Sequence, residues 1–204
     1  MFTHPVFKEH AADFDPILAK LIAGAGAARD AFNRHSRTSI EELKNLTQTA
    51  TQEIAATRKN LEEQKARKSE AEQQILLRLA NLCTHLQNLA HNLTSLVEPI
   101  QKKSQNQVLF SDKAVSQTNY LFDTQAGLLR SVRDIANTNN EFLKKYTETE
   151  ARNLIQACNN FATEHETRMI EGLCLPQAAP LFLTILDNMR MMGQQEVELV
   201  KLLG

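Results

Sequence analysis

With 204 residues, the chain is long enough for one domain or two small ones with a sizeable core. Hydrophobic residues make up 42% of it and aromatics only 5%, and the low numbers of Gly (6) and Pro (5) favour an all-α fold. The formal net charge of −1 excludes the global basic field that would recruit nucleic acid or an anionic membrane.

The first part of the chain predicts two helices. Asp15 followed by Pro16 is typical of a helix start, with Asp as the N-cap and Pro at the first helical position. Ser39 and Glu42 have the spacing of a capping box, in which each side chain bonds to the backbone N–H of the other residue. They predict a second helix that runs to about Arg67.

A third helix is predicted to begin at Ser69, which forms another capping box with Glu72, and to end before Pro99. Neither Gly nor Pro interrupts this part of the chain, so one unbroken helix over residues 39–98 is the alternative. We favour a break or a sharp bend near residues 67–69.

The second part of the chain repeats this organisation. The polar stretch QKKSQNQ at 101–107 predicts a linker, and Ser111–Asp112 predicts the cap of a fourth helix. The NTNN cluster at 137–140 predicts a turn. A fifth helix is then expected over about 141–171, and the Gly and Pro of the segment 172–176 predict a tight connection to a sixth, closing helix.

The closing helix carries a broad apolar stripe, because its apolar residues recur at intervals of three and four. A stripe of this width must be buried against other helices, so the closing helix is expected to lie in the core. The residues of the stripe are Leu181, Phe182, Ile185, Leu186, Met189, Met192, Leu199, Val200 and Leu203.

Sliding the chain against itself by 103 residues brings its two halves into register. The shift places Leu18 on Leu121 in the first helix of each half. It also places apolar residues of the third helix on apolar residues of the closing helix. This internal repeat predicts two similar three-helix bundles, one formed by residues 1–103 and the other by residues 104–204.

The ends of the chain and its cysteines favour a cytoplasmic protein. The first residues have neither the basic segment nor the apolar core of a signal peptide, and nowhere do about 18 apolar residues run together. Cys83, Cys158 and Cys174 are an odd number, widely spaced and without a CxxC pair. We expect them to be reduced and to act as small hydrophobic residues.

The chain shows no pattern that assembles catalytic chemistry. Its six His residues are scattered, and it has no HExxH pair, no P-loop, no GxSxG and no GxGxxG. His85 and His91 are six residues apart and do not share one helix face, so a polar surface or core role is favoured over metal ligation. We therefore expect no enzyme activity and no cofactor.

The segment from Phe161 to Gly193 resembles the end of a PhoU-like domain, particularly the version attached to bacterial sodium/phosphate cotransporters. The segment 108–114 is similar to a helix start of that family, and 85–98 resembles the closing helix of its first repeat. The resemblance covers nearly the whole chain and implies two tandem three-helix bundles. The residues that carry it most clearly are His165, Arg168, Gly172, Cys174, Pro176, Phe182, Ile185 and Leu186.

The chain departs from the family at one motif. The closing helices of the family typically carry Glu-x-x-x-Asp, two carboxylates one turn apart that can hold metal ions. In this chain the first pair becomes Gln87 and His91, and the second becomes Arg190 and Gln194. A neutral amide and an imidazole suit a hard cation poorly, and an Arg repels it, so no metal is expected at these positions.

The resemblance implies a cytoplasmic regulatory or accessory module of phosphate uptake, placed at the inner face of the membrane through a transporter. Its expected partner is a phosphate transporter or a sensor protein, with a homo-oligomer as a further option and no nucleic acid. Two alternatives stay open: an interaction scaffold unrelated to phosphate, and a degenerate metal-binding bundle in which His91 still binds a transition metal.

Overall fold

Every regular element among residues 5–66 and 68–204, which the computed structural model describes, is a helix. The all-α prediction is thereby confirmed. In chain order the elements are α1 (Pro5–Arg34), α2 (Arg37–Lys65), α3 (Glu70–Ser95), α4 (Val97–Gln105), α5 (Asp112–Thr138), α6 (Glu141–Ile170), the 3-10 turn η1 (Pro176–Ala178) and α7 (Ala179–Leu202).

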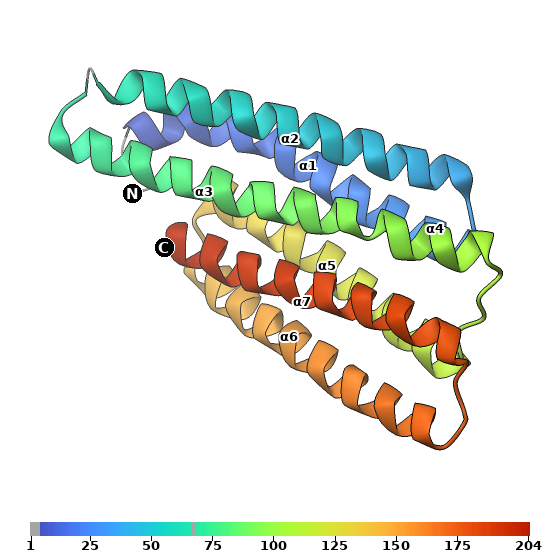
Figure 1. Ribbon diagram of the computed structural model, residues 1–204. Coiled ribbons are helices and arrows are strands. Elements are labelled where there is room, and N and C mark those ends of the chain that lie inside the picture. Colours follow the sequence, from blue (N-terminus) through green and yellow to red (C-terminus); the bar gives the residue numbers. More distant parts are fainter. Residues whose placement is uncertain (1–4, 67) are drawn as a thin grey trace.

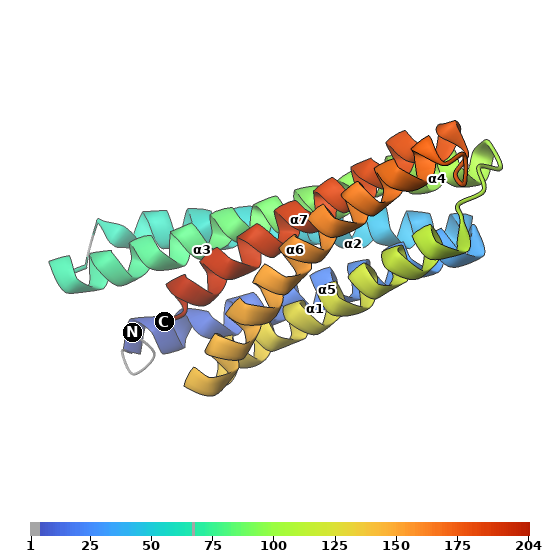
Figure 2. The same cartoon turned by 90° about the horizontal axis from the view of Figure 1, so that it is seen from below.

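The helices form two three-helix bundles that lie side by side (Figure 1). One bundle contains α1, α2 and α3, the other contains α5, α6 and α7, and contacts of α1 with α5 and of α3 with α7 join them. The start of α1 and the C-terminus lie at one end of the molecule (Figures 1 and 2). The α1–α2, α4–α5 and α6–α7 connections lie at the opposite end, which we call the distal end.

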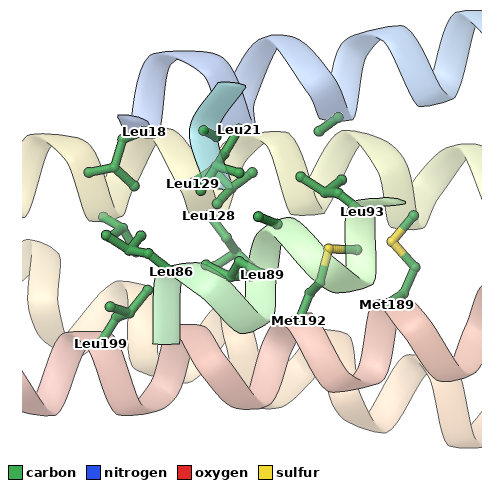
Figure 3. Packing of buried hydrophobic residues seen from close by; sticks show 14 of the residues in the cluster. Leu18, Leu21, Leu86, Leu89, Leu93, Leu128, Leu129, Met189, Met192 and Leu199 are labelled. Atoms are coloured by element: carbon green, nitrogen blue, oxygen red, sulfur yellow. The ribbon is translucent and has the colours of Figure 1, made fainter. Parts of the chain in front are cut away.

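One apolar core runs through both bundles (Figure 3). The apolar stripe predicted for the closing helix lies in it, apart from the half-buried Leu181, and the side chains of Met189 and Met192 have no exposed surface. None of the labelled residues is more than 3% exposed. They are Leu18 and Leu21 of α1, Leu86, Leu89 and Leu93 of α3, Leu128 and Leu129 of α5, and Met189, Met192 and Leu199 of α7.

The first helix begins earlier than predicted. Pro16 lies inside α1 rather than at its start, because Val6 and Phe7 are buried at 3% and 2% exposure and hold the preceding turns in the core. Asp15 does not cap the helix. Its carboxylate instead accepts hydrogen bonds from Arg133 of α5 at 2.7 and 2.8 Å, so it joins the two bundles.

The start of the second helix is also shifted, whereas the break before the third is confirmed. Ser36, not Ser39, is the N-cap of α2, and its hydroxyl accepts the Ser39 N–H at 3.0 Å. The capping box of Ser69 and Glu72 is present at the start of α3. The predicted break therefore lies between α2 and α3; Arg67, which belongs to this connection, is outside the described residues.

Most of the predicted linker at 101–107 is helical. Pro99 does not end a helix, because it lies in the first turn of α4, where a missing N–H costs no hydrogen bond. Ile100 and Lys103 are buried on the inner side of α4 and fix it to the distal end of both bundles. The break between α3 and α4 is a single residue, Leu96.

The internal repeat needs two shifts rather than one. A shift of 104 residues places Ile40 and Leu43 on Lys144 and Thr147, and each of these four residues is buried. In the closing helices, by contrast, the buried faces agree at the predicted shift of 103, which places Leu79 on Phe182. The single shift is therefore wrong for the first two helices of each bundle, because the connection to the last helix is one residue shorter in the second bundle.

Candidate functional site at the distal end

The four positions of the degenerate motif lie on α3 and α7. Gln87 is turned toward α2, where its amide reaches the Thr51 hydroxyl at 3.5 Å, and His91 is exposed. Arg190 pairs with Asp187 on its own helix, and Gln194 is half-buried. Within the described part of the chain, no three His, Cys, Asp or Glu side chains gather closely enough to hold a metal ion.

A buried polar pair connects α5 to α7. The Gln125 amide donates a hydrogen bond of 2.6 Å to one carboxylate oxygen of Glu196, and both side chains have no exposed surface. Among the residues that the structure describes, the second Glu196 oxygen and the Gln125 side-chain carbonyl oxygen have no hydrogen-bond partner. Burial raises the pKa of Glu196 well above its usual value, since desolvation outweighs the hydrogen bond from Gln125.

Aromatic packing fixes the α4–α5 connection at the distal end. The Phe110 ring lies edge-on between Phe32 of α1, at 5.6 Å, and Phe182 of α7, at 6.0 Å. Lys103 donates a hydrogen bond of 3.0 Å to the Phe32 carbonyl, and its ammonium group lies 4.5 Å from the Phe32 ring centre. Because Phe110 is anchored inward, its neighbour Leu109 is directed to solvent, where it is 73% exposed.

The α6–α7 connection is held equally firmly. Gly172 adopts a left-handed conformation with φ of 72°, as its position predicts, and the Leu173 N–H bonds back to the Arg168 carbonyl at 2.8 Å. The Cys174 thiol lies 3.8 Å from the Ser111 hydroxyl. This contact brings the α6–α7 connection against the start of α5 and thus against the α4–α5 connection.

Four aliphatic side chains project from these two adjoining connections and from the last residue of α6. Ile170 is 82% exposed, Leu109 73%, Leu173 63% and Leu175 50%. We call this set the distal patch. Single exposed aliphatic residues are common on protein surfaces, but several on neighbouring, well-anchored segments are typical of a surface that binds another molecule.

A polar cluster lies beside the distal patch, between α5 and α6. Gln117 donates to Glu164 at 2.8 Å and accepts from Arg168 at 3.1 Å. His165 is 2% exposed, and its ring lies 4.8 Å from that of Phe182. Burial, and secondarily the Arg168 charge, lower the pKa of His165, so this imidazole is neutral at physiological pH.

The buried thiols of the chain are not poised as nucleophiles. Burial raises the pKa of Cys83 and of Cys158 to about 12, so both remain protonated at neutral pH. This agrees with the prediction that they act as small hydrophobic residues. Cys174 is only half-buried and is positioned by its contact with Ser111.

Sequence reasoning missed the distal patch and the Gln125–Glu196 pair. The patch depends on two connections that meet only in the fold. The burial of Glu196 could have been predicted, because it lies four residues after Met192 and three before Leu199. This spacing places it on the apolar face of the closing helix. His85 and Asn88 of α3 both contact the side-chain oxygen of Gln195 of α7, at 2.9 and 3.1 Å.

Comparison with known proteins shows the fold. No protein family model matches the chain, and no curated protein does either. Among solved structures, the chain is similar to PhoU from Pseudomonas aeruginosa, with a TM-score of 0.82 over 97% of this chain and 95% of that chain. The sequences are 8% identical, so the likeness is one of fold: an all-α, PhoU-like pair of three-helix bundles.

Proposed function

We propose that the chain is a non-enzymatic regulatory or accessory protein of phosphate uptake. In this proposal it acts in the cytoplasm by contact with a phosphate transporter or a sensor protein, as the resemblance to cotransporter-attached PhoU-like domains implies. The observation that carries the proposal is the PhoU-like fold along nearly the entire chain, with a TM-score of 0.82. No helix among the described residues is long and apolar enough to cross a membrane.

The distal patch is the surface we assign to this contact. Leu109, Ile170, Leu173 and Leu175 remain exposed although the connections that carry them are anchored by Phe110 and by the Gly172 turn. A rigid group of aliphatic side chains loses little entropy when a partner covers it, and its burial supplies a hydrophobic driving force.

Phosphate uptake in cells that lack the protein tests the function. Uptake of labelled phosphate should no longer adjust to external phosphate, and the wild-type chain should restore the adjustment. The double variant Ile170→Asp, Leu173→Asp should fold normally, since both side chains are exposed, but should not restore it. An uptake response unchanged by the deletion would contradict the proposal and favour a scaffold unrelated to phosphate.

The motif positions Gln87, His91, Arg190 and Gln194 are proposed to hold no metal. Arg190 brings a positive charge to the second pair, and neither pair contains a carboxylate. Protein purified without chelator should therefore carry no stoichiometric Fe, Mn, Mg or Zn by elemental analysis. About one metal per chain, lost on His91→Ala, would instead support the degenerate metal-binding alternative.

The division of the chain into two units between residues 103 and 104 also stays a prediction, which limited proteolysis can test.

A further inference from the structure

A groove lies between α5 and α6, toward the end of the molecule that holds the α5–α6 turn. Its volume is about 330 Å³. We call it the α5–α6 groove. Its lining residues are Asp123, Thr124, Gly127, Leu128 and Ser131 of α5, and Tyr146 and Glu150 of α6. Since the α5–α6 turn and the distal end lie at opposite ends of the molecule, the groove is separate from the distal patch (Figures 1 and 2).

The groove is open because of its residue types. Asp123, Gly127 and Ser131 recur every four residues along one face of α5, and a Cβ atom added at Gly127 would meet nothing within 4 Å. On the opposite side, Tyr146 and Glu150 are also four residues apart, and Tyr146 is 51% exposed. The groove therefore has an open floor, one free aromatic face and a carboxylate at its side.

The matching seam of the first bundle is built differently. At the shift of 104 residues that aligns the buried faces, Gly127 and Ser131 correspond to Ala23 and Ala27, and Glu150 corresponds to the half-buried Leu46. At these three positions the first bundle thus uses aliphatic residues where the second uses a glycine, a hydroxyl and a carboxylate, whereas Thr124 and Tyr146 correspond to Lys20 and Glu42. Since the same helix pair packs in the first bundle without Gly127, Ser131 or Glu150, these three residues are not required for helix packing.

The charges of the groove fit a cation. Its lining contains two carboxylates and no Lys or Arg. Arg29 of α1 pairs with Asp123 at 3.0 Å, whereas the hydrogen bond to Glu150 comes from a neutral group, the Asn153 amide, at 2.9 Å. Among the described residues, Glu150 has no ion pair with a Lys or Arg, and the exposed Tyr146 ring lies on the same helix one turn away.

We propose that the α5–α6 groove binds an arginine side chain presented by a segment of a partner protein. A guanidinium group can stack on the Tyr146 ring while it donates two parallel hydrogen bonds to the Glu150 carboxylate. Lysine offers a compact, strongly hydrated charge without a planar face, so it gains less from the same site. The proposal does not depend on a role in phosphate uptake, because it concerns a different surface and a different chemistry.

Amide NMR spectra of the full chain test the proposal with three probe peptides: acetyl-Leu-Arg-Leu-amide, its lysine counterpart and its citrulline counterpart. Citrulline keeps the shape of arginine without its charge. The arginine peptide should give saturable shifts at Gly127, Ser131, Tyr146 and Glu150. It should bind several-fold more tightly than the lysine peptide, and the citrulline peptide should not bind.

Three variants and a control define the site. Glu150→Gln should weaken arginine binding about tenfold, as expected for loss of a charge-assisted pair, and Tyr146→Ala should weaken it several-fold. Gly127→Leu should fill the groove and abolish binding without lowering the melting temperature, since its Cβ enters open space. Glu166→Gln removes the same charge from an exposed position of α6 outside the groove lining and should leave binding unchanged.

Several results would overturn the proposal. Shifts at carboxylates scattered outside the groove lining, equal binding of the three peptides, or wild-type binding by Gly127→Leu would each exclude an arginine site in the groove. A self-association that Gly127→Leu abolishes would place a second copy of the chain there instead. A loss of phosphate regulation with intact arginine binding, or the reverse, distinguishes this proposal from the proposed function.

Discussion

At the scale of single residues, the most unusual feature is a carboxyl group in the core. Glu196 has no exposed surface, and within the described part of the chain its side chain has one hydrogen bond, which comes from the neutral amide of Gln125. Burying a carboxylate without a positive partner is costly, so the folded protein favours the protonated acid. The equivalent position in the first bundle, at the 103-residue shift of the closing helices, is Leu93, which shows that the fold itself does not require a polar group there.

The stability of the protein should therefore depend on pH through Glu196. Its folded-state pKa is raised well above 4.5, so the folded protein keeps a proton that the unfolded chain releases. As pH rises above about 4.5, the free energy of unfolding should fall relative to that of Glu196→Gln, by at most about 1.4 kcal/mol per pH unit, and level off above the folded-state pKa. Denaturant melts from pH 4 to 8 measure this difference.

A control and a contrary outcome complete this prediction. Glu42→Gln removes an exposed carboxylate and reports the effect of net charge alone. A constant difference in unfolding free energy between wild type and Glu196→Gln across the pH range would mean that folding does not raise the pKa of Glu196.

At the scale of helices, α7 and α5 of the second bundle use glycine in opposite ways. Gly193 of α7 lies in the tight contact with α6, where an added Cβ would meet Ile155 at 3.0 Å and the Ala151 carbonyl oxygen at 3.3 Å. Gly127 of α5 faces the open groove. Both lie within helices, where alanine is intrinsically preferred, so the surroundings alone should decide the effect of a substitution.

Two matched substitutions test this difference. Gly193→Ala should lower the free energy of unfolding by roughly 1–3 kcal/mol, because a backbone carbonyl cannot move away from the new methyl group. Gly127→Ala should raise it by about 0.5–1 kcal/mol, because it removes backbone freedom without a clash. If denaturant melts showed the same sign for both substitutions, the α6–α7 contact would not be as close as the structure places it.

Helix types could be predicted from the sequence, whereas some boundaries could not. The Ser69–Glu72 box is a local signal and correctly marks the start of α3. Pro16 gave a misleading signal, since a proline at a helix start and one inside a helix differ only in what precedes them, here the buried Val6 and Phe7. The α4 helix was not predicted because most of its sequence is polar. Ile100 and Lys103 are buried only because both bundles pack against this helix.

At the scale of the whole molecule, comparison of the two repeats indicates which residues are not needed for helix packing. The two bundles share a fold and a pattern of buried positions, so places where they differ are not required by packing. The α5–α6 groove and Glu196 are two such places. The distal patch is a different kind of feature, because it depends on the contact between the α4–α5 and α6–α7 connections. These connections are far apart in the sequence, so the patch could not be predicted without the fold.

Capture of partners from native lysate tests the central claim most directly. Wild-type protein and the Ile170→Asp, Leu173→Asp variant would each serve as bait in lysates of cells grown at low and at high phosphate. The captured proteins would be quantified by mass spectrometry. We expect the wild type to capture a phosphate transporter or a phosphate-sensing protein, to a degree that depends on phosphate, and the variant to lose it. Capture of only proteins unconnected with phosphate, or equal capture by both baits, would contradict a regulatory contact through the distal patch.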